Sequence, residues 1–107
     1  MSDVASLRAS LQQIDAILAR QPHGPELRAA HLDLVTLAGQ LQGAVSERRR
    51  GDGETPAVRD AEASLDAMKA GVRQVGMDIR LASEGTLQFG LEACVRDAFQ
   101  VLDDLKR

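Results

Sequence analysis

One apolar stripe of unusual length runs through the second half of the chain. Its members recur with alternating gaps of three and four over eight positions: Val58, Ala61, Leu65, Met68, Val72, Val75, Ile79 and Ala82. This spacing returns side chains to one face of an α-helix, whereas a half-buried strand would alternate every second residue. Thr55 and Pro56 stand where an N-cap and a first helical residue belong. The pattern predicts a helix over 56–83.

Two further stripes precede it. The first predicts a helix over 3–20 with Ser2 or Asp3 as its cap, and consists of Val4, Leu7, Leu11, Ile14 and Leu18. The second predicts a helix over 26–49 and consists of Leu27, Ala30, Leu34, Leu37, Leu41 and Ala44. Pro22, Gly24 and Pro25 interrupt the pattern between them, and so short a connection predicts an antiparallel hairpin over 3–49. Residues 46–55, which are polar and rich in glycine, are expected to form a loop.

A fourth stripe begins in a shifted phase. It consists of Leu87, Leu91, Cys94, Ala98, Val101 and Leu105, and predicts a helix over 86–106. We expect a break at 83–86, with Gly85 in the left-handed position that ends a helix and Thr86 as the next cap. The alternative is one continuous helix of about 50 residues, roughly 75 Å long at 1.5 Å per residue, which would have to pack against another chain.

The composition agrees with helices. Apolar residues make up 44% of the chain and are mostly alanine, leucine and valine, with two phenylalanines and neither tryptophan nor tyrosine. These residues favour helix over strand. A chain of 107 residues is long enough for one core. We therefore predict an all-α protein, a single helical domain over 1–107 whose antiparallel hairpins form a three- or four-helix bundle.

Charge and the rarer residues exclude several functions. The net charge of −3 offers no basic face, so we expect no nucleic-acid partner, and no stretch is apolar enough to suggest a membrane partner. Cys94 has no second cysteine to pair with, and two histidines eight residues apart do not have metal-ligand spacing. We expect a cytoplasmic protein without metal or cofactor. The basic cluster Arg48–Arg50 suits a helix C-terminus, although a small nucleic-acid-associated regulator using this cluster and Arg59 remains an alternative.

We do not expect an enzyme, because the sequence holds no nucleophile elbow, phosphate-binding loop or convergent polar constellation. One segment nevertheless resembles a known family. Residues 7–18, with leucine-arginine, then isoleucine-aspartate, then leucine, are similar to the opening helix of the AroQ-type chorismate mutases. That family is an all-helical dimer in which arginine and lysine side chains bind a dicarboxylate. The resemblance covers a dozen residues. An enzyme of this kind is the third hypothesis, after a protein-interaction module and the nucleic-acid-associated regulator.

The glycines suggest where a partner would bind. Residues 71–78 are echoed at 85–92, with glycine, glutamine and an acid returning in order, although each helical glycine costs about 0.8–1.0 kcal/mol against alanine. Such glycines allow a second backbone to come close, either within the chain or from another one. We predict a protein-interaction module that acts as a homo-oligomer, an adaptor or a chaperone-like binder of a partner's helix. The expected partner-binding residues are Val72, Val75, Gly76, Ile79, Phe89 and Gly90.

Overall fold

The computed structural model describes residues 4–107 and contains four helices. They are α1 (Val4–Ala19), α2 (Gly24–Asp52), α3 (Pro56–Asp78) and α4 (Glu84–Leu105). No strand occurs in this part of the chain. The all-α prediction is therefore confirmed, while the expected caps Ser2 and Asp3 lie outside the described residues.

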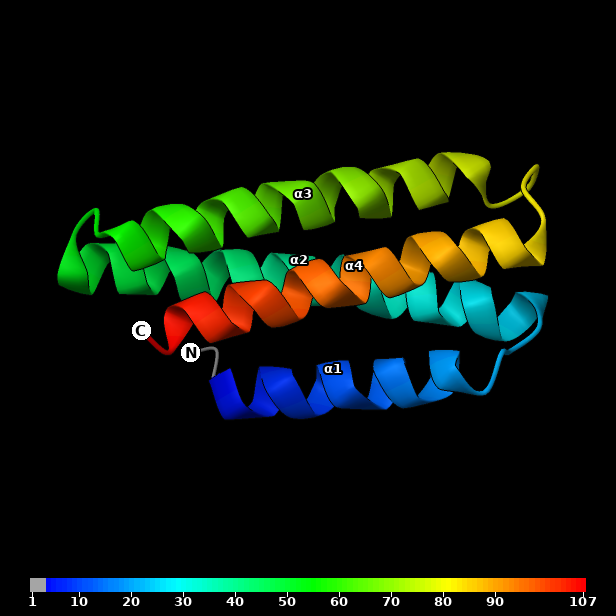
Figure 1. Ribbon diagram of the computed structural model, residues 1–107, viewed down its shortest axis with the longest axis horizontal. Coiled ribbons are helices and arrows are strands. Elements are labelled where there is room, and N and C mark those ends of the chain that lie inside the picture. Colours follow the sequence, from blue (N-terminus) through cyan, green and yellow to red (C-terminus); the bar gives the residue numbers. More distant parts are fainter. Residues whose placement is uncertain (1–3) are drawn as a thin grey trace.

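The helices form an elongated bundle measuring 42 × 22 × 18 Å. Each helix runs antiparallel to the one before it, so α2 and α4 point the same way (Figure 1). One end of the bundle carries the α1–α2 and α3–α4 connections, and we call it the two-loop end. The other end carries the α2–α3 connection, the start of α1 and the end of α4, and we call it the one-loop end (Figure 1).

The helices are not equivalent in their packing. The α3–α4 pairing is the most extensive, and α2 packs against both of these helices. By contrast, α1 packs against α2 and α4, and nowhere do the Cα atoms of α1 and α3 come within 8 Å of each other. The cross-section is therefore a rhombus whose short diagonal joins α2 and α4.

The core is made by the stripes that the sequence shows. Each helix turns its own stripe inward, and the largest fully buried side chains include Leu11 and Leu18 of α1, Leu34 of α2, Met68 of α3 and Leu91 of α4. The eight-position stripe of the second half is shared between elements. Its first six members are buried in α3, whereas Ile79 and Ala82 lie beyond the helix and pack partly buried against the core. Packing within the chain thus accounts for the length of this stripe.

The prediction of a polar loop over 46–55 is wrong for most of its length. α2 continues to Asp52, and the connection to α3 is only residues 53–55. Arg48 binds the carboxylate of Asp52 one turn later, which supports the last turn of the helix. Gly53 then adopts φ +76° and donates its N–H to the carbonyl of Arg49 at 2.8 Å, which ends the helix.

The break between the last two helices is confirmed, but its details differ from the prediction. α3 ends at Asp78 rather than near 83, and α4 begins at Glu84. Ser83 is the N-cap, because its hydroxyl accepts the N–H of Thr86 at 3.2 Å. The assignments of Gly85 to a left-handed position and of Thr86 to the cap are wrong, since both lie in the first turn of α4. A serine one residue before an acidic first turn is the better cap.

Candidate functional site

The residues predicted to bind a partner occupy three kinds of position. Val72 and Val75 are buried, at 7% and 5% exposed, and belong to the chain's own core. Ile79 is partly buried just after α3. Phe89, in contrast, is 71% exposed on α4 near the two-loop end. Of these four side chains, Phe89 is the one placed to meet a partner without rearrangement of the bundle.

The two predicted glycines lie at contacts between helices of the same chain. A Cβ atom at Gly90 would stand 2.8 Å from Cγ2 of Val75, which places α4 close against α3. A Cβ atom at Gly76 would stand 3.2 Å from Nε2 of His31, on α2. The sequence left open whether the close neighbour belongs to the same chain or to another one, and the structure gives each glycine a neighbour within its own fold.

Gly76 gives room to a histidine that links two helices. Nε2 of the half-buried His31 lies 3.0 Å from the carbonyl oxygen of Val72. A side chain at position 76 would press on this ring. The structure shows the reason for a polar residue at position 31: it hydrogen-bonds across the α2–α3 interface.

Cys94 is enclosed where α4 meets α3. It is 1% exposed, and a Cβ atom at Gly71 would lie 2.9 Å from its sulfur atom. Burial, with a smaller contribution from the negative charge of Asp97, raises the pKa of the Cys94 thiol to about 11. A buried thiol that resists ionisation is a poor nucleophile, so Cys94 acts as a small core residue.

Large apolar side chains are exposed at the two-loop end. Among the residues that the structure describes, the large hydrophobic residues with exposed side chains are Leu32, Val35, Met77, Leu81 and Phe89. Leu32 and Val35 lie in the first half of α2, and Met77 lies in the last turn of α3. Leu81 is in the α3–α4 connection and is 89% exposed. All five belong to segments that lie toward the two-loop end (Figure 1).

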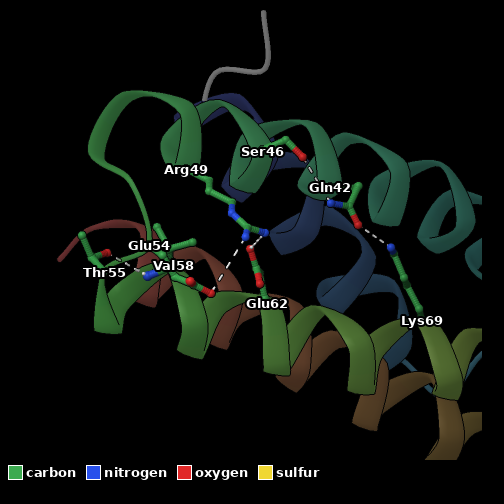
Figure 2. A network of polar contacts seen from close by, with 8 residues as sticks. All are labelled: Gln42, Ser46, Arg49, Glu54, Thr55, Val58, Glu62 and Lys69. Carbon is green, nitrogen blue, oxygen red and sulfur yellow. Dashed lines mark hydrogen bonds and ion pairs between the residues drawn. The ribbon is translucent and has the colours of Figure 1, made fainter.

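Ion pairs gather toward the one-loop end. Arg49 reaches from α2 to Glu62 of α3 at 3.2 Å and to Glu54 at 3.9 Å (Figure 2). In the same network Lys69 of α3 donates to Gln42 of α2, and Thr55 caps α3 by accepting the N–H of Val58 (Figure 2). Further pairs join α1 to α4 and α3 to the C-terminal residue, namely Arg8 with Asp103 at 2.8 Å and Arg107 with Asp60 at 2.6 Å.

Two arginines of the cluster Arg48–Arg50 make polar contacts at this end. Arg48 binds Asp52 and the carbonyl of Leu105, and Arg49 binds the two glutamates already described. Their guanidinium groups therefore join the end of α2 to its neighbours, as expected of cations at a helix C-terminus. Three other arginines, Arg8, Arg28 and Arg73, lie on α1, α2 and α3, and α1 does not pack against α3.

Most of the exposed apolar surface was not predicted from the sequence. Of its residues, only Phe89 was assigned to partner binding. A signal was present for Leu32, Met77 and Leu81, because each falls outside the stripe of its own segment. A large apolar residue away from the buried face of an amphipathic helix must be exposed unless another element covers it.

The described residues contain no cluster of three or more metal-binding side chains. Within the same residues, no helix combines the length and the apolar character needed to cross a bilayer. No family model, curated protein or solved structure matches the chain.

Proposed function

We propose that this protein is a small helical interaction module that binds a protein partner through the apolar surface of its two-loop end. By this surface we mean the exposed large apolar side chains of that end, which come from α2, α3, α4 and the α3–α4 connection: Leu32, Val35, Met77, Leu81 and Phe89. One observation carries the proposal. The exposed large apolar side chains lie toward one end of the bundle, and most of the ion pairs lie toward the other.

A single exposed leucine needs no functional explanation, because folded proteins expose much apolar surface. Several exposed apolar residues that share one end of an elongated bundle are a different case. Covering them would contribute about 25 cal/mol for each Å² removed from water. Leucine, methionine and phenylalanine also present no charge that would have to be desolvated. This chemistry fits the apolar face of a partner protein better than a phosphate backbone or a small polar ligand.

The proposed partner is either a second copy of the chain or another protein. We also propose a cytoplasmic location. The single cysteine is buried and unpaired, as expected in a reducing compartment, where structural disulfides are rare.

The test compares partner capture by matched variants. Leu32→Ser, Met77→Ser and Phe89→Ser each remove an exposed apolar side chain and should leave the core intact. Arg59→Ser changes an exposed residue near the one-loop end and serves as the control. Wild type and Arg59→Ser should retain the same partner in affinity purification from the native host, and the three apolar variants should lose it. Equal capture by all four variants would contradict the proposal.

A further inference from the structure

The topology makes α1 the separable part of the bundle. Helices α2, α3 and α4 each pack against the other two and form a closed three-helix unit. α1 lies in the groove between α2 and α4 and does not pack against α3. It is held by a single apolar face, which consists of Leu7, Leu11, Ile14 and Leu18. Its polar contacts include Arg8 with Asp103 at 2.8 Å and the carbonyl of Leu18 with Nε2 of Gln88 at 2.6 Å.

The connection that folds α1 back onto α2 is short and strained. It comprises residues 20–23, and Gln21 has φ +52°, the one positive value at a non-glycine residue in the described chain. A left-handed conformation crowds the Cβ atom of any residue other than glycine. Gln21 also precedes Pro22, and the residue before a proline prefers an extended backbone. Two independent preferences of Gln21 therefore oppose the closed hairpin.

Opening this connection would give an extended linker. Pro22 and Pro25 cannot lie inside a continuous helix, so α1 and α2 would not merge into one rod. With Gln21 extended, α1 would point away from its own groove. The vacated groove between α2 and α4 would then require a helix with apolar residues at positions i, i+4, i+7 and i+11, the spacing of Leu7, Leu11, Ile14 and Leu18. The helix that demonstrably fits this groove is α1 itself.

We infer that two copies of the chain exchange their α1 helices and form a symmetric dimer. Each α1 occupies the α2–α4 groove of the other copy, so the contacts of the closed chain are remade between chains while Gln21 relaxes in both. The hinge lies at the two-loop end (Figure 1), so the second copy meets the first at the end that carries the α3–α4 connection, with the exposed Leu81, and the start of α4, with the exposed Phe89. This inference rests on the proposed function and deepens it, because it names a second copy as a partner of that surface.

The exchange is tested by asking whether one contact lies within or between chains. The guanidinium carbon of Arg8 stands 5.9 Å from the centre of the Phe99 ring, and the chain has only two phenylalanines, so the ring signals are simple to assign. Equal amounts of ¹³C-labelled and unlabelled protein are unfolded, mixed and refolded at high concentration. We expect a dimer by light scattering and an isotope-filtered nuclear Overhauser effect between Arg8 of one chain and Phe99 of the other. A dimer in which this contact is only intramolecular would overturn the exchange, as would a monomer at every concentration.

Two hinge variants test the source of the exchange. Gln21→Gly accepts the left-handed conformation without strain and should lower the dimer fraction several-fold at a given concentration. Gln21→Ala keeps the strain and should behave like the wild type. Equal dimerisation of the two variants would overturn the role of the hinge.

Failure of the exchange can be distinguished from failure of the proposed function. A chain that stays monomeric, yet captures another protein in a manner that requires Phe89, would overturn the exchange and leave the interaction surface standing. A Phe89→Ser variant that exchanges α1 as readily as the wild type would support the exchange and count against a role for the apolar surface in it.

Discussion

Gly90 offers the sharpest test of how α3 and α4 pack. A methyl group added at this position would begin 2.8 Å from Cγ2 of Val75. Carbon atoms make their best contacts at about 3.5–4.0 Å, so the two groups would overlap. Val75 cannot easily move away, because it is 5% exposed and its β-branched side chain has few rotamers. Gly90→Ala must therefore push the two helices apart or force Val75 into a poorer conformation.

The size of the effect follows from two opposing terms. Alanine is favoured over glycine in a helix interior by about 0.8–1.0 kcal/mol. Overpacking a tight interface costs about 1–3 kcal/mol. The net change in the free energy of unfolding should lie between about zero and a loss of about 2 kcal/mol. Gly39→Ala is the matched control, because a Cβ atom there would meet nothing within 4 Å, and it should stabilise α2 by about 0.8–1.0 kcal/mol.

The assay is urea unfolding followed by circular dichroism, with both variants measured against the wild type. The free energies of unfolding of the two variants, each taken relative to the wild type, should differ by about 1–3 kcal/mol. Because both variants replace a helical glycine by alanine, helix propensity cancels and the difference reports the overlap with Val75. In the Val75→Ala background the penalty at position 90 should disappear, since the opposing methyl group is absent. If Gly90→Ala stabilises the protein as much as Gly39→Ala does, position 90 of α4 does not lie close against Val75 of α3.

Two other predictions concern the cap of α3 and the thiol of Cys94. Thr55→Ala removes the hydroxyl that accepts the N–H of Val58 and should cost about 1 kcal/mol in thermal unfolding, whereas Thr36→Ala, exposed within α2, should cause no loss because alanine favours helix over threonine. Similar losses for both threonines would argue against the cap. Burial raises the pKa of Cys94 from 9.0 to about 11, so the native state binds this proton more tightly than the unfolded chain. That contribution to stability is complete below pH 9 and is lost as the pH rises from 9 to about 11. Unfolding free energies over this range should therefore fall more steeply for the wild type than for Cys94→Ala, and parallel pH profiles would refute the shift.

The core could be predicted from the sequence because it depends on local periodicity. The stripes through Leu11, Leu34, Met68 and Leu91 identify buried faces without any knowledge of which helices meet. The ends of helices were predicted less well, since they depend on single side chains. Arg48 extends α2 by binding Asp52, and Ser83 rather than Thr86 caps α4.

The site could be predicted only in part, because exposure depends on the arrangement of all four helices. The spacing of the glycines indicated a close approach, but not that the neighbour of Gly90 is Val75 of the same chain. Likewise, the apolar residues Leu32 and Leu81 are far apart in sequence, and only the antiparallel order of the helices brings the start of α2 and the α3–α4 connection, where they lie, to the same end of the bundle (Figure 1).

The most direct test of the central claim is site-specific photo-cross-linking in the native host. A photoreactive phenylalanine analogue placed at Phe89 probes the apolar surface of the two-loop end, and the same analogue placed at Arg59 probes the opposite end. The account predicts a discrete protein adduct from position 89, whose mass identifies either a second copy or another partner, and no such adduct from position 59. An adduct at position 59 and none at position 89 would contradict the assignment of the two-loop end as the binding surface.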